Sequence, residues 1–242
     1  MSNRFYDIYV RDPQQPAPPE EIKEQYGLVK LGEDVSVTTV NSIYGVGWSA
    51  ARAMISSAAK TGEDRTKDWD AKRGTTVHEM FEALLRFGRS QFSPDDYPGY
   101  EAFAVPVLDW YNTFEPKPLD VSYPGGDTIP GVEFVVWNRR HGFAGRADAY
   151  AEVTYQDRRV KAFLDYKSVG EEKKLDYPPY PENVSELIAR AQTLTTYGIP
   201  IDLSLLVRVS PEGHHTTPYW PDDWPAHFES YLRAKGEWEH RR

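Results

Sequence analysis

A short apolar run that ends in an acid and a base restricts the fold of this chain more than any other feature. The run consists of Ala162, Phe163 and Leu164, and Asp165 and Lys167 follow it. Side chains alternate along a strand, so Asp165 and Lys167 are predicted to share one face. A buried carboxylate or ammonium group is costly unless it is paired or bound to a metal. The segment therefore predicts a core strand that ends in a functional site or in an ion pair.

A second acid–base pair lies in a stretch with helical spacing. Apolar residues recur at helical intervals over residues 71–89, and His78 and Glu82 lie four positions apart within it. Side chains four apart lie on the same side of a helix, so both can face one point. The same spacing also fits a surface pair beside the apolar stripe of the helix.

The strand predicted before Asp165 carries another carboxylate. Alternation over residues 145–154 places Arg146 and Asp148 on one face. If the two strands are neighbours, Asp148 and Asp165 can approach closely, and two such carboxylates repel unless a cation or a proton lies between them. A divalent metal suits these oxygen ligands: Mg²⁺, or Mn²⁺ if an imidazole also binds. The alternative is an ion pair between the strands, Asp148 with Lys167 or Arg146 with Asp165, without a catalytic role.

The order of predicted elements indicates an α/β fold with a central mixed sheet flanked by helices. Helices are predicted over residues 48–60, 71–89, 100–114 and 183–197, and strands over 35–40, 132–137, 145–154, 160–166 and 201–209. The three middle strands are close enough in sequence to form a meander. We expect a partly extended N-terminal arm over residues 1–34, a core over 35–210, and a C-terminal loop and helix packed on the core over 211–242.

Composition excludes several classes of protein. The formal charge of −9 argues against a protein that coats nucleic acid over its whole surface. The chain has no cysteine, which rules out disulfides, thiolate zinc sites, a cysteine-bound iron–sulfur cluster and a cysteine nucleophile. No stretch has the length of apolar sequence that a membrane span needs, and the N-terminus does not resemble a secretory signal. A cytoplasmic protein without a membrane partner is the expectation.

Four segments in a fixed order resemble the RecB-type nucleases of the PD-(D/E)XK superfamily. They are residues 74–82 with Gly-x-x-x-His, residues 145–148 with Gly-x-x-Asp, residues 165–167 with Asp-x-Lys, and Gln192 with Tyr197. The resemblance covers about residues 37–209. It is strongest to the phage-encoded exonucleases related to the CRISPR adaptation nucleases, because residues 37–40 and Val132-Glu133 also fit their pattern. Tyr197 follows Gln192 by five positions, whereas the family has a spacing of four. Because the chain has no cysteine, it fits the branch of the family that has no iron–sulfur cluster.

The resemblance implies a restriction-endonuclease-like core and a Mg²⁺- or Mn²⁺-dependent deoxyribonuclease, an exonuclease, that hydrolyses phosphodiester bonds with metal-activated water. It implies roles for eight residues: metal ligation by His78, Asp148, Asp165 and the backbone carbonyl of Tyr166; catalysis by Asp148, Asp165 and Lys167; support of His78 or of the metal by Glu82; and substrate contact by Gln192 and Tyr197. Lys167 would position or deprotonate the water, or stabilise developing charge. The implied partners are DNA, further copies of the chain and a recombination protein, in the host cytoplasm if a phage encodes the chain.

Two other functions fit the same residues. The shifted spacing of Gln192 and Tyr197 and the acidic composition fit a catalytically inactive module that binds nucleic acid or a partner protein with the nuclease fold. His78 and the two aspartates also fit a metal hydrolase that acts on a phosphoester other than DNA. Saturable metal dependence separates the first alternative from a nuclease, and competition by DNA separates the second.

Overall fold

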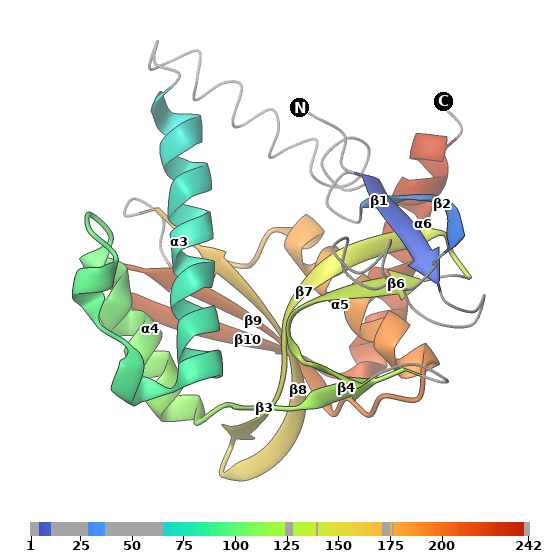
Figure 1. Cartoon of the computed structure of the whole chain (residues 1–242). Coiled ribbons are helices and arrows are strands. Elements are labelled where there is room, and N and C mark those ends of the chain that lie inside the picture. Colours follow the sequence, from blue (N-terminus) through green and yellow to red (C-terminus); the bar gives the residue numbers. More distant parts are fainter. Residues whose placement is uncertain are drawn as a thin grey trace.

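A mixed sheet forms the centre of the molecule (Figure 1). The computed structural model describes residues 5–10, 29–36, 65–123, 128–138, 140–170, 175 and 177–239. The sheet strands are β1 (Phe5–Val10), β2 (Val29–Ser36), β3 (Lys117–Pro118), β6 (Val132–Asn138), β7 (Phe143–Tyr155), β8 (Arg158–Ser168), β9 (Leu203–Ser210) and β10 (Gly213–Tyr219). Their order is β1-β2-β7-β8-β9-β10, and β3 and β6 also pair with β7. The β2–β7 and β8–β9 pairs are parallel and the other pairs are antiparallel.

Helices cover both faces of this sheet, and the predicted α/β fold with a central mixed sheet flanked by helices is confirmed (Figure 1). The helices are α3 (Arg65–Phe87), α4 (Glu101–Phe114), α5 (Pro181–Thr196) and α6 (Trp224–Glu239), with short 3-10 turns at η2 (Arg89–Gln91), η3 (Pro94–Asp96) and η4 (Pro221–Asp223). A separate two-stranded sheet joins β4 (Asp120–Ser122) to β5 (Thr128–Pro130). Among the described helices, none combines the length and the apolar character that crossing a membrane requires.

Strand β8 contributes to both layers of the core. Leu164 and Tyr166 lie in the cluster formed with α3 and α4, whereas Phe163 lies in the cluster formed with α5 and the first residue of α6. Asp165 follows the same alternation as Phe163 and reaches a side chain of α5. Because both faces of this strand are covered over residues 162–166, that part of the strand is apolar apart from Asp165, and an acid there needs a dedicated partner.

The predicted meander is confirmed, since β6, β7 and β8 pair antiparallel in sequence order. Helix α3 begins at Arg65, six residues before the predicted start at residue 71, so the charged residues 65–70 are helical. The predicted C-terminal loop was wrong over Gly213–Tyr219, which forms β10 against β9. Its side chains are mostly half-buried without alternation, so the sequence carries no strand period there. The helix predicted over residues 48–60 lies outside the described residues.

An aromatic stack joins the end of β8 to α3. The rings of Tyr166 and Phe81 lie parallel with centroids 3.8 Å apart, and Trp110 of α4 packs edge-on against both. All three side chains are buried. Aromatic pairs of this kind stabilise the fold beyond the contribution of the apolar area that they remove from water. The stack thereby fixes the backbone of Tyr166 against the helix that carries His78.

Gly131 fixes the start of β6, and replacing it with alanine should destabilise the fold. An added Cβ would lie 2.3 Å from the Leu119 carbonyl oxygen and 2.9 Å from that of Tyr150. Since both obstacles are backbone atoms, we expect Gly131→Ala to lower the free energy of unfolding by about 1–3 kcal/mol. Urea denaturation measures this change. The matched control is Gly236→Ala in α6, where a Cβ meets nothing within 4 Å, and it should leave stability unchanged or raise it. Equal stability of the two variants would contradict the backbone contact.

Candidate metal centre

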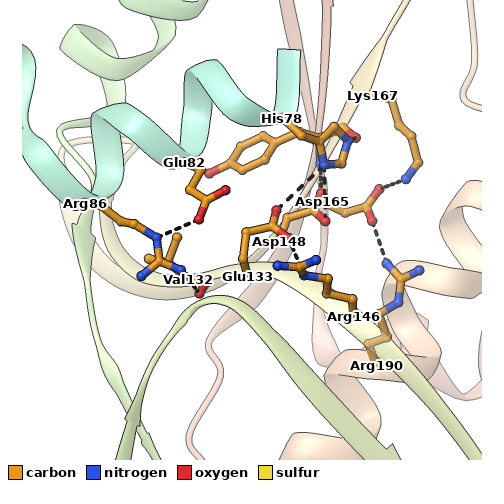
Figure 2. A network of polar contacts seen from close by, with 11 residues as sticks. His78, Glu82, Arg86, Val132, Glu133, Arg146, Asp148, Asp165, Lys167 and Arg190 are labelled. Atoms are coloured by element: carbon orange, nitrogen blue, oxygen red, sulfur yellow. Dashed lines mark hydrogen bonds and ion pairs between the residues drawn. The ribbon is translucent and has the colours of Figure 1, made fainter. Parts of the chain in front are cut away.

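Three side chains from separate elements converge beside the end of β8: His78 of α3, Glu133 of β6 and Asp148 of β7 (Figure 2). Nδ1 of His78 lies 3.6 Å from Oδ1 of Asp148 and 3.9 Å from Oε1 of Glu133. The three candidate ligand atoms all lie within 4.8 Å of one another. Metal–ligand bonds of about 2.2 Å at angles of about 90–120° separate ligand atoms by about 3.1–3.8 Å. The His78–Asp148 separation falls in this range and the His78–Glu133 separation lies just above it, so a small movement of the side chains would let the three atoms share one cation.

The other polar atom of each of these side chains is held by a hydrogen bond or an ion pair. The Tyr166 carbonyl lies 2.7 Å from Nε2 of His78, and the Tyr166 N–H donates to Oδ2 of Asp148 at 2.6 Å. Nε of Arg146 lies 2.7 Å from Oε2 of Glu133. Metal-binding side chains typically have such partners, which fix their orientation and leave the remaining atom for the ion. All three candidate ligands show this arrangement.

The hydrogen bond to Tyr166 determines which nitrogen of His78 faces the acids. A carbonyl oxygen only accepts, so Nε2 carries the proton and Nδ1 is directed to Asp148 and Glu133. In a neutral ring, Nδ1 carries a lone pair that faces two carboxylates. This arrangement is unfavourable unless a proton or a cation lies between Nδ1 and the carboxylate oxygens. Burial alone would lower the pKa of His78, but the carboxylates of Asp148 and Glu133 outweigh it and raise that pKa. The location therefore attracts positive charge.

Asp148 is itself unfavourably placed as an isolated anion. Burial raises its pKa, and the charge of Asp165 raises it further against the opposing effect of His78. Two buried carboxylates in this arrangement are stabilised by a cation between or beside them. The prediction that Asp148 and Asp165 interact across adjacent strands is confirmed.

Glu133 is the ligand candidate that the sequence did not identify. In the sequence, Val132-Glu133 fits the family pattern but has no predicted metal-binding role. The backbone of Glu133 has φ of +53°, a left-handed conformation that is unfavourable for a residue with a side chain and unusual within a strand. Strain of this kind persists where the surroundings require it, and here it accompanies a carboxylate directed at His78. No feature of the one-dimensional sequence signals this conformation.

Asp165 lies beside the three converging residues, but both of its oxygens face cations. Its side chain is 1% exposed; Oδ1 lies 2.8 Å from Nη1 of Arg190 and Oδ2 lies 2.6 Å from Nζ of Lys167. Although burial would raise the pKa of Asp165, Lys167 and Arg190 lower it overall. Burial would lower the pKa of Lys167, but Asp165, Asp148 and Glu186 raise it. The predicted shared face of Asp165 and Lys167 is confirmed, and the pair lies within one strand instead of bridging two.

The remaining predicted site residues are not members of the converging group. Oε1 of Glu82 accepts a hydrogen bond from Nε of Arg86 at 2.7 Å, one helical turn beyond His78, and Glu82 is not a member of the converging group. The Tyr166 carbonyl, implied as a metal ligand, is the acceptor for His78. The Tyr197 hydroxyl donates to the Trp137 carbonyl.

Gln192 and Tyr197 share a pocket of about 470 Å³ that contains none of the converging residues. It is lined by Asn138, Arg140, His141, Gln192, Thr196, Tyr197 and Phe228. Helix α5 instead directs Arg190 at Asp165, with Glu186 four residues earlier. The substrate contacts predicted for Gln192 and Tyr197 stay a prediction, and the side chain of α5 that pairs with Asp165 is Arg190.

Comparisons with known proteins add no assignment. No family model matches the chain, and no curated protein matches it. Among solved structures, the crystal structure of SSO0001 is similar over 90% of this chain and 83% of that chain, with 12% sequence identity and a TM-score of 0.37. A similarity of this size supports no conclusion about fold family or activity.

Proposed function

We propose that this protein is a divalent-metal-dependent phosphodiester hydrolase that acts on DNA, an exonuclease with a restriction-endonuclease-like core. One observation carries the proposal: three ligand atoms of His78, Glu133 and Asp148 converge while the other polar atom of each side chain is held by a partner. A half-buried ammonium group, Lys167, lies beside them. The resemblance of four ordered segments to the RecB-type nucleases supplies DNA as the substrate.

The balance of charge favours a bound cation. Four carboxylates, those of Glu133, Asp148, Asp165 and Glu186, meet three cations, those of Arg146, Lys167 and Arg190. With His78 neutral, these seven described side chains carry one excess negative charge, which repels a phosphate. A divalent ion would reverse the sign and attract the substrate. This local reversal is compatible with the acidic composition of the whole chain.

The donor set fits Mg²⁺ or Mn²⁺, with Mn²⁺ favoured by the imidazole. Such an ion, when bound, supplies a nucleophile from water and polarises the phosphoryl oxygen. His78, Glu133 and Asp148 would hold it, and the Tyr166 backbone would keep His78 and Asp148 in place. Lys167, as an ammonium, would stabilise the negative charge that develops on the phosphate. The side chain of Arg146 is 62% exposed beside Glu133, so it can also contact a phosphate oxygen.

Metal titration with a linear DNA substrate tests this function. We expect hydrolysis that saturates with Mg²⁺ or Mn²⁺ and stops on chelation, with mononucleotides or short products released from the ends. A covalently closed circle of the same sequence is the matched control and should resist an exonuclease. Saturable metal binding without hydrolysis of linear DNA would contradict DNA as the substrate and favour a metal hydrolase of another phosphoester, since an inactive binding module should show no saturable metal dependence. Absence of both metal binding and hydrolysis would refute the proposal.

A further inference from the structure

We propose that Arg190 is a positioning residue that fixes Asp165 and, through Asp165, the ammonium group of Lys167. This inference rests on the proposed hydrolase function and concerns a residue that the family resemblance does not include. Nη1 of Arg190 lies 2.8 Å from Oδ1 of Asp165, and Nζ of Lys167 lies 2.6 Å from Oδ2 (Figure 2). One carboxylate thus links a cation from α5 to a cation from β8.

The burial of Arg190 argues against direct contact between its side chain and the substrate. The side chain of Arg190 is 7% exposed, whereas that of Lys167 is 25% exposed and that of Arg146 is 62% exposed. A bound phosphate can reach the two more exposed cations, and Arg190 lies behind Asp165. We therefore expect Arg190 to influence hydrolysis chiefly through the Asp165 carboxylate that it holds.

Arg190 fixes the orientation of the Asp165 carboxylate, and that orientation places the ammonium group of Lys167. Lysine has a flexible four-carbon stem, so its ammonium is well placed only if its partner is fixed. Asp165 also lies near Asp148, whose charge it repels. Without Arg190, one oxygen of Asp165 would lose its cation, and the carboxylate could rotate away from Lys167 or compete for the metal. Arg190 holds Asp165 in the orientation that directs its second oxygen at Lys167.

The partner of Arg190 on its own helix supports a fixed guanidinium. Nη2 of Arg190 lies 3.4 Å from Oε2 of Glu186, four residues earlier in α5, and both side chains are buried. Side chains at this spacing lie on one side of a helix, so α5 presents an acid and a base together to the end of β8. The fork of a guanidinium can contact both carboxylates at once, which an ammonium at the same position could not match.

A double-mutant cycle on DNA hydrolysis tests this role. The variants are Arg190→Met, Lys167→Met and their combination, with kcat measured at saturating Mn²⁺ and saturating linear DNA. We expect Arg190→Met alone to lower kcat by about 10–100-fold, the size typical of residues that orient functional groups. In the Lys167→Met background it should change kcat by less than about 2-fold, because residues acting as one unit are not additive. The dissociation constant for Mn²⁺, measured by electron paramagnetic resonance, should stay within about 3-fold.

Two further variants keep the test decisive. Arg159→Met is the matched control, since Arg159 pairs with Glu152 at the other end of β8, and it should leave kcat unchanged. If Arg190→Met fails to fold, Arg190→Lys takes its place in the cycle, with a smaller but equally non-additive loss. Equal loss of kcat in both backgrounds would overturn the positioning role, as would a loss of Mn²⁺ affinity that accounts for the whole effect. Absence of hydrolysis by the unmodified protein would instead refute the proposed function.

Discussion

Asp148→Asn is expected to abolish metal binding and to lower DNA hydrolysis by at least roughly 1,000-fold, because the ion supplies several kcal/mol of charge stabilisation in the transition state. The substitution keeps the shape of the side chain and an oxygen that can accept the Tyr166 N–H, but it removes the charge directed at His78. Burial raises the pKa of Asp148, so the metal-free protein carries this carboxylate at a cost. The metal-free variant should therefore be at least as stable as the metal-free parent.

Thermal unfolding with and without Mn²⁺ separates these effects. At an ion concentration roughly 100 times the dissociation constant, the unmodified protein should gain about 2.7 kcal/mol, equivalent to about 5–10 °C in Tm for a chain of this size. Asp148→Asn should show no gain. The control is Glu152→Gln, which lies on the same strand β7 and pairs with Arg159, and it should retain the full shift. An unchanged Mn²⁺ shift in Asp148→Asn would show that the ion binds elsewhere.

Lys167→Met should reduce kcat by about 100–1,000-fold, the loss typical when one group that stabilises transition-state charge is removed. Its ammonium is held 2.6 Å from Asp165, and nearby carboxylates raise its pKa despite burial, so it acts as a cation. Because Lys167 is not a ligand in the converging group, the Mn²⁺ shift in Tm should persist. Lys167→Met should thus lose turnover but keep metal binding, whereas Asp148→Asn should lose both.

A Lys167→Arg variant provides the matched control for charge. It keeps the cation but changes its shape, and we expect a partial recovery of kcat relative to Lys167→Met. Single-turnover hydrolysis of end-labelled DNA, at saturating Mn²⁺, measures all three proteins. Turnover by Lys167→Met equal to that of the unmodified protein would refute the catalytic role of Lys167.

Local periodicity predicted much of the fold and the positions of two of the three converging residues, His78 and Asp148. Alternation along β8 placed Asp165 and Lys167 together, and the short connections between three apolar runs predicted the meander that brings Asp148 beside them. His78 lies on α3 as its spacing indicated. These features depend on neighbours close in sequence, which is why the sequence alone was sufficient for them.

Glu133 and Arg190 depend on tertiary contacts that no local pattern encodes. Glu133 reaches the centre through a left-handed backbone in β6, a conformation that glutamate does not favour intrinsically. Arg190 differs from the predicted Gln192 by two positions, which is more than half a turn of a helix, so the choice depends on which face of α5 packs on the sheet. The apolar residues Leu187, Ala191 and Leu194 mark that face in the sequence, but whether Arg190 reaches Asp165 depends on how the helix is positioned against β8.

Anomalous diffraction from crystals soaked in Mn²⁺ shows whether His78, Glu133 and Asp148 bind one divalent ion. We expect one peak at about 2.0–2.4 Å from Nδ1 of His78, Oδ1 of Asp148 and Oε1 of Glu133, with Asp165 still paired to Lys167 and Arg190. Crystals of Asp148→Asn soaked in the same way should lack this peak. A fully soaked crystal with no ion between these three side chains, or with the ion held by Asp165 while Glu133 points away, would refute the proposed metal centre.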